Sequence, residues 1–246
     1  MKKDTLQNKA NLTVLRAKHL GMCFGVRDAI TLAKRVVKSR PLTVLGELVH
    51  NATVLDDLRG EGVQFETLAS DVKTETVMIT AHGASNRTKM RARESGLKLR
   101  DATCPLVHHA HKQVRQLVED GYHPVVIGRR GHVEVRGLTE DLSEHDVVLS
   151  EDDIDALSLR RRYGVVAQTT QPIARVHELV DYLKNRFPAA EVRFEDTVCQ
   201  PTKQRQSAAV ELAKRSDVVL VVGGANSNNT HELAKMAPRW PRWRQD

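Results

Sequence analysis

Three cysteines each begin the same succession of features, and this threefold repeat constrains the fold more than any other property of the sequence. After Cys23, Cys104 and Cys199, apolar residues follow at helical spacing, and a short apolar segment typical of a strand comes next. A glycine then follows each cysteine at a distance of 23, 24 and 24 positions. So constant a register indicates three copies of one structural unit.

The repeat predicts an α/β fold. We expect strands at residues 42–45, 124–127 and 218–222, each preceded by a helix that starts at the cysteine. Alternating helices and strands favour lobes with mainly parallel sheets, whose ligands gather beyond the carboxyl ends of the strands. Three pseudo-symmetric lobes would then point their cysteines at one central cavity. Their expected limits are 16–104, 105–196 and 197–246.

The third unit is expected to be incomplete. In the first two units a second helix and strand lead to another polar residue, His82 and Thr169. A counterpart in the third unit would fall beyond Asp246, and the chain instead ends in PRWPRWRQD, which has neither helical nor strand periodicity. The sequence therefore predicts a truncated third lobe with an aperiodic tail.

The spacing of the cysteines favours a shared metal centre. Three cysteines without a CxxC pair indicate neither a disulfide framework nor a zinc ribbon. Thiolates are soft ligands that suit iron-sulfur clusters, zinc or copper, and three of them leave one position of a four-ligand centre open. An iron-sulfur cluster with one iron free to bind substrate is the interpretation we prefer over three cysteines that only fill the core.

Polar residues recur near the predicted strand ends and helix starts. His50, His132 and Ser227 each stand four positions after the glycine of their unit. Hydroxyl, amide and imidazole groups near helix starts suit a diphosphate, and protonated histidines would add charge-assisted hydrogen bonds. Glu134 is a candidate for proton transfer, with an ordinary surface carboxylate as the alternative. The predicted polar ring comprises His50, His82, His132, Thr169, Ser227 and Asn229.

The charge balance permits an anionic partner without choosing one. The chain has 38 basic and 31 acidic residues, and its formal net charge is +7. Nucleic acid, a phosphorylated metabolite and a merely solvated basic surface all fit this balance. The sequence has no apolar run of about 18 residues and no apolar leader, so we expect a cytoplasmic protein without a membrane span.

Eight motifs between about residues 16 and 237 carry a resemblance to a known enzyme family. They read GMCFGVRDAI, GELVHNATVLDDLRGEGVQF, TAHGAS, DATCPLVHHAH, GHVEVRG, AQTTQP, DTVCQPTKQRQ and GGANSNNTHELAKMA. With these motifs the chain resembles the 4-hydroxy-3-methylbut-2-enyl diphosphate reductase family, the last enzymes of the methylerythritol phosphate route to isoprenoids. The resemblance implies three α/β lobes around a central cluster and a closed polar pocket for an allylic diphosphate.

The resemblance also implies roles for individual residues. Cys23, Cys104 and Cys199 would ligate a [4Fe-4S] cluster, and Glu134 would relay a proton. His132 and Thr169 would assist Glu134 in catalysis. The residues that would bind substrate are His50, His82, His132, Thr169, Ser227, Asn228 and Asn229.

The implied reaction removes the allylic hydroxyl reductively and yields isopentenyl and dimethylallyl diphosphate. A ferredoxin or flavodoxin would supply electrons, since its acidic surface suits a basic protein. Two alternatives stay open: a truncated, non-catalytic paralogue that still binds a cluster, and a basic nucleic-acid-binding protein. The second explains none of the cysteine spacing, so no nucleic-acid partner is expected.

Overall fold

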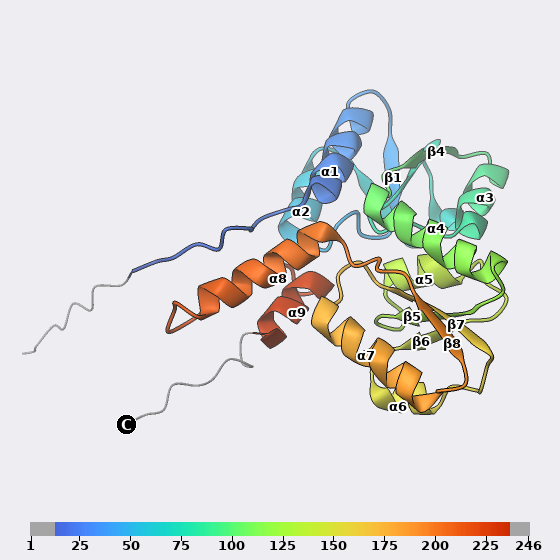
Figure 1. Ribbon diagram of the computed structural model, residues 1–246. Helices are drawn as coiled ribbons and strands as arrows, with labels where there is room; N and C mark the ends of the chain where they lie inside the picture. The colour runs from blue at the N-terminus through green and yellow to red at the C-terminus, as the bar shows by residue number, and fades with distance from the viewer. Residues whose placement is uncertain (1–12, 237–246) are drawn as a thin grey trace, which may run out of the picture.

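The computed structural model describes residues 13–236, and two parallel four-stranded sheets form its framework (Figure 1). The strand orders β2-β1-β3-β4 and β6-β5-β7-β8 are equivalent, so the first two units of the repeat have the same topology. The α/β class and the parallel sheets are confirmed. The strands are β1 (Leu42–Leu45), β2 (Gln64–Glu66), β3 (Thr76–Ile79), β4 (Lys98–Asp101), β5 (His123–Ile127), β6 (Asp146–Val148), β7 (Arg162–Ala167) and β8 (Glu191–Phe194).

Helices connect the strands as parallel pairing requires. A helix begins directly after each cysteine, so the helical starts expected from the sequence are confirmed. The helices are α1 (Phe24–Val37), α2 (Ala52–Gly60), the 3-10 turn η1 (Ala69–Asp71), α3 (Asn86–Glu94), α4 (Pro105–Glu119), α5 (Val133–Thr139), α6 (Glu151–Asp155), α7 (Ile173–Arg186), α8 (Gln200–Ala213) and α9 (Asn228–Met236).

The central strands are apolar on both faces because helices cover both sides of each sheet. In the second sheet, Val125 faces the side of α7, where it shares a core with Leu179. Its neighbour Val126 faces the opposite side and packs with Val114 and Leu117 of α4. Successive residues of a strand point to opposite faces, so the apolar run Val125–Ile127 supplies two cores at once.

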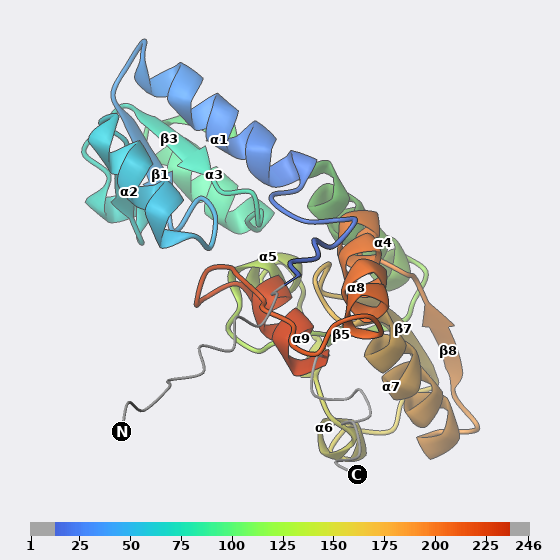
Figure 2. The same cartoon turned by 90° about the vertical axis from the view of Figure 1, so that its left-hand side faces the viewer.

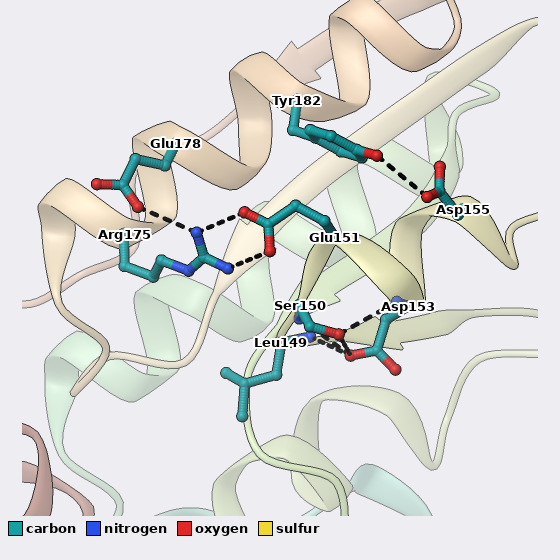
Figure 3. A network of polar contacts seen from close by, with 8 residues as sticks. All are labelled: Leu149, Ser150, Glu151, Asp153, Asp155, Arg175, Glu178 and Tyr182. Atoms are coloured by element: carbon teal, nitrogen blue, oxygen red, sulfur yellow. Dashed lines mark hydrogen bonds and ion pairs between the residues drawn. The ribbon is translucent and has the colours of Figure 1, made fainter.

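A network of polar contacts fixes α6 against α7 within the second lobe (Figure 3). Nη1 and Nη2 of Arg175 donate to the two carboxylate oxygens of Glu151 at 2.7 and 2.5 Å. The hydroxyl of Tyr182 donates to Asp155 at 3.1 Å. The start of α6 is stabilised separately by a capping box of Ser150 and Asp153.

The third unit does not contain the expected strand. Residues 218–222 have no regular secondary structure, although they follow α8 at the predicted place. Val218, Leu220 and Val222 are 75, 84 and 95% exposed. A strand needs a hydrogen-bonded neighbour, and in the described part of the chain no strand lies beside this segment. The strand prediction is therefore wrong, because apolar composition alone does not supply a pairing partner.

Two helices represent the third unit among residues 13–236. α8 and α9 lie side by side, as both views show (Figure 1 and Figure 2). The tail at 238–246 lies outside the described residues. The limits of the three lobes stay a prediction. In the part of the chain that the structure describes, no helix is both long and apolar enough to cross a membrane.

Candidate active site

The three cysteines occupy equivalent positions around one cavity of about 450 Å³. Cys23, Cys104 and Cys199 are the N-cap residues of α1, α4 and α8, and all three are free and partly buried. A Cβ atom on Gly25 would collide with Sγ of Cys104, so the first turn of α1 passes directly over that thiol. The repeat thus brings cysteines that are distant in sequence to the same space.

The surroundings of the thiols fit a thiolate-ligated cluster. Burial raises the pKa of Cys104 and of Cys199, and the charges of Cys23 and Glu134 act in the same direction. A bound metal reverses this effect because it deprotonates a coordinating thiol. Within residues 13–236, no three His, Cys, Asp or Glu side chains are grouped closely enough to hold a single metal ion. The three thiols line the same cavity of about 450 Å³, so they are available to one shared ligand.

Three histidines from two lobes meet at the same cavity. The rings of His50 and His82 stack with centroids 4.1 Å apart, and His132 lies edge-on to them at 5.3 and 5.8 Å. Nε2 of His50, Nδ1 of His82 and Nε2 of His132 are buried and have no hydrogen-bond partner among the described residues. Buried polar atoms without partners cost free energy, on the order of 1–3 kcal/mol each. A ligand with several acceptor oxygens would satisfy all three.

Burial keeps two of these imidazoles neutral at pH 7. It lowers the pKa of His82 well below its ordinary value, and the neighbouring His50 and His132 lower it further. Burial, together with His50 and Arg129, lowers the pKa of His132 to about 4. The expectation of protonated histidines concerns the pocket with a bound diphosphate, and it stays a prediction. An anionic ligand would favour the charged form and raise both pKa values.

Glu134 is buried within the cavity wall, so it is not an ordinary surface carboxylate. Its side chain lies in the first turn of α5 and is 1% exposed. The backbone N–H of Thr169 donates to Oε1 at 2.6 Å, and the Thr169 hydroxyl donates to Oε2 at 3.0 Å. Burial raises the pKa of Glu134 to about 7, although these two hydrogen bonds lower it. Such a carboxyl can both hold and release a proton near neutral pH.

The third unit completes the cavity with polar groups at the start of α9. Ser227, Asn228 and Asn229 line the cavity. Nδ2 of Asn228 donates to Oγ1 of Thr170 at 2.9 Å, which ties this unit to the second lobe. On the other side, the amide of Asn226 donates to Glu47 of the first lobe at 3.4 Å. These two contacts tie the start of α9 to loops of the first and the second lobe.

Comparison with known proteins identifies the family. The LytB protein family matches residues 14–241. The chain belongs to the LytB family. A LytB relative from Acinetobacter baumannii (strain ATCC 17978), named 4-hydroxy-3-methylbut-2-enyl diphosphate reductase, is 36% identical over 238 residues, which cover 93% of this chain and 75% of the relative. A Stenotrophomonas maltophilia (strain K279a) protein with the same name is 37% identical, over 93% of this chain and 76% of that protein.

Solved structures of LytB proteins share the fold. The E-1-hydroxy-2-methyl-but-2-enyl-4-diphosphate reductase from Plasmodium falciparum superimposes with a TM-score of 0.83 at 31% identity, over 89% of this chain and 70% of that one. A second structure, described as the terminal enzyme of the non-mevalonate pathway, gives a TM-score of 0.71 at 35% identity. The match covers 91% of this chain and 81% of that one. The LytB family is generally iron-sulfur dependent.

The cavity of this LytB protein brings together every site residue predicted from the sequence, while the roles of these residues stay predictions. Sequence reasoning missed Asn51, Thr170 and Thr202, which also line the cavity. Oγ1 of Thr202 lies 3.1 Å from Sγ of Cys199. A threonine one helical turn after a helix-starting cysteine was the available signal for Thr202. The predicted residues that line the cavity are Cys23, His50, His82, Cys104, His132, Glu134, Thr169, Cys199, Ser227, Asn228 and Asn229.

Proposed function

We propose that this LytB protein reduces 4-hydroxy-3-methylbut-2-enyl diphosphate to isopentenyl and dimethylallyl diphosphate, the last step of the methylerythritol phosphate route. Two electrons and two protons replace the allylic hydroxyl with hydrogen, and the hydroxyl leaves as water. The observation that carries the proposal is the shared cavity, which combines three thiols, three histidines with unpaired nitrogens and a buried carboxyl.

Cys23, Cys104 and Cys199 would hold a [4Fe-4S] cluster. Such a cluster supplies electrons and a Lewis-acidic iron for the hydroxyl of the substrate. The three thiols come from helix starts in three different units, so the protein can leave one side of the cluster free for substrate.

The polar side of the cavity would bind the diphosphate. His50, His82 and His132 can donate from buried ring nitrogens that have no partner among the described residues. Ser227 and Asn229 add neutral donors at the start of α9, and Asn228 joins them through its link to Thr170. These groups would close around the anion and exclude water from the reacting end.

Glu134 would deliver a proton to the substrate. Because burial raises the pKa of Glu134 to about 7, the carboxyl can hold a proton and release it near neutral pH. Thr169 keeps both carboxylate oxygens in place, and the hydroxyl of Thr169 can pass on the proton of Glu134 within the same hydrogen-bonded pair. His132, the N-cap of α5, lies two residues before Glu134 and can orient the bound anion.

A small acidic electron carrier, of the ferredoxin or flavodoxin type, would dock on a basic groove. The groove has a volume of about 510 Å³ and lies between residues 16–19 and α8, two segments that each lead to a cysteine. Arg16, Lys18 and Arg215 contribute three positive charges to it, against the single carboxylate of Glu211 among its lining residues. Lys203 also lines the groove, and its ammonium is paired with Asp196 at 2.6 Å. Opposite charge on a partner would speed its association at low salt. We also place the reaction in the cytoplasm, where thiols stay reduced.

The test is iron and acid-labile sulfide per chain after anaerobic reconstitution, followed by turnover of the diphosphate substrate with a reduced donor. Wild type should hold about four irons, as a [4Fe-4S] cluster requires, and Cys104→Ser should lose them. Glu134→Gln is the matched variant: it should keep the cluster and lose turnover. Iron-free wild type, or Glu134→Gln as active as wild type, would contradict the proposal.

One observation favours a second candidate, a cluster-binding protein without turnover. Residues 219–222 line the cavity, yet the segment 218–222 is largely exposed and unpaired. A wall of this kind would not exclude water. A full complement of iron together with no turnover under any donor would support this reading.

A further inference from the structure

The first and second lobes meet at a seam beside the cavity, formed by α3, α4 and the end of α5. α3 follows directly after the loop that carries His82, and Ser85 caps it. Ser85 is fully buried, and its hydroxyl oxygen accepts from the backbone N–H of Thr88 at 3.0 Å. The position of His82 is therefore coupled to the start of α3.

Two consecutive carboxylates of the second lobe bind this helix start. The backbone N–H groups of Asn86 and Arg87 donate to the two oxygens of Asp141 at 2.6 and 3.0 Å. The hydroxyls of Ser85 and Thr88 donate to one oxygen of Glu140 at 2.5 and 3.0 Å. Carboxylates bind well at a helix N-terminus because its N–H groups and its dipole both favour negative charge.

α5 connects these carboxylates to the cavity. This seven-residue helix begins after its N-cap His132, carries Glu134 in its first turn and ends at its C-cap Glu140. A helix is rigid over so short a length, so a shift at Glu140 moves Glu134 as well. The seam therefore connects His82 in the first lobe to His132 and Glu134 in the second.

His111 fills the seam on its inner side. The side chain comes from α4, the helix that begins after Cys104, and the residue is only 7% exposed. Its Nε2 would lie 3.3 Å from a Cβ atom on Gly83 and 3.5 Å from one on Gly137. These two glycines belong to the His82 loop and to α5, so the ring packs between them. Nε2 has no hydrogen-bond partner among the described residues, which fits a role in packing.

We infer that Glu140, Asp141 and His111 are positioning residues that set the separation of His82 from His132 and Glu134 across the lobe boundary. The carboxylates hold the two lobes together, and the imidazole ring keeps them from closing further. The inference rests on the proposed function, because it says that the seam sets the width of the pocket that would bind the diphosphate. The positions that the seam gives to His82, His132 and Glu134 do not depend on that function.

The experiment compares Asp141→Ala with Glu151→Ala in the full 246-residue chain. Glu151 is the matched control because it also joins two helices through a carboxylate, but it binds Arg175 within one lobe and does not line the cavity (Figure 3). Melting temperature, calorimetric affinity for inorganic diphosphate and NMR signals of labelled histidine rings are measured for both.

Both variants should melt earlier, but only Asp141→Ala should weaken diphosphate binding, by about tenfold, as coupling between sites typically does. Only Asp141→Ala should also shift the ring signals of His82 and His132. Asp141→Asn retains one acceptor oxygen, so its diphosphate affinity should lie between those of Asp141→Ala and wild type. Asp141→Asn replaces Asp141→Ala in the comparison if the alanine variant does not fold. His111→Ala should shift the same ring signals.

Equal effects of Asp141→Ala and Glu151→Ala on the histidine signals would overturn the inference. Failure of the wild type to bind diphosphate would count against the proposed function alone, because the ring signals require no ligand.

Discussion

Thr169 donates two hydrogen bonds to Glu134, one to each carboxylate oxygen, from its backbone and from its hydroxyl. Thr169 follows β7, and Glu134 lies in the first turn of α5, which follows β5. The two hydrogen bonds therefore connect the loops after the neighbouring strands β5 and β7 at the cavity. Despite both bonds, burial dominates and the pKa of Glu134 rises to about 7. A buried acid in this state has a measurable cost for stability.

Glu134→Gln should stabilise the chain at high pH. The pKa of Glu134 is higher in the folded than in the unfolded state, so its contribution is present below pH 4.5 and is lost as the pH rises to about 7. At about 1.4 kcal/mol per pKa unit, the loss reaches about 3 kcal/mol. Urea unfolding of the cluster-free chain at pH 4.5 and pH 8 measures it. Glu119→Gln, at an exposed site, is the control and should change stability little at either pH. If Glu134→Gln is no more stable than wild type at pH 8, the buried-acid account is refuted.

Binding of inorganic diphosphate should take up protons at pH 7. His82 and His132 are neutral in the pocket without an anion, and the charge of the ligand raises their pKa values. Titration calorimetry in buffers of different ionisation enthalpy measures the uptake. His132→Gln should reduce it, whereas His177→Gln, an exposed position on α7, should leave it unchanged. Binding without proton uptake would mean that other groups neutralise the diphosphate.

The segment 218–222 should promote self-association of the 246-residue chain. Val218, Leu220 and Val222 are exposed in a row and have the composition of a strand, so they offer an apolar edge to another copy. Leu220→Lys should shift the sedimentation profile toward monomer. Leu159→Lys is the control, since Leu159 is 74% exposed in the loop between α6 and β7 of the second lobe. A wild-type chain that sediments as a clean monomer at high concentration would contradict the prediction.

The apolar core of the second lobe should dominate its stability. Leu179 of α7 is fully buried, so Leu179→Ala should lower the free energy of unfolding by about 2–5 kcal/mol through lost burial and a residual cavity. Leu159→Ala, at an exposed position, should change it by less than about 0.5 kcal/mol. Denaturant unfolding of both variants provides the comparison. Similar values for the two variants would contradict the prediction, because burial of Leu179 would then add nothing to stability.

The parts of the fold that follow from local spacing were predictable. The predicted strand at 42–45 coincides with β1, and each helix begins directly after its cysteine. The register also singles out His50 and His132, because equivalent strand ends of parallel lobes face the same cavity.

The features that depend on non-local contacts were not predictable. Residues 218–222 have strand composition but no pairing neighbour among the described strands, and composition does not reveal this. Asp141 binds the backbone of Asn86 across 55 positions of sequence, and nothing in the sequence marks an aspartate as the partner of a distant helix start. The lowered pKa of His82 likewise depends on burial and on His50 and His132, which are distant in sequence.

The placement of all three cysteines at helix starts has an electrochemical consequence. A helix N-terminus carries roughly half a positive elementary charge. α1, α4 and α8 therefore direct three such partial charges toward the same thiols. Adding an electron to thiolate-bound iron makes the site more negative, and these fixed dipoles oppose the penalty that burial places on that charge. If the three thiols hold the proposed cluster, the helical framework itself would raise the reduction potential of that cluster.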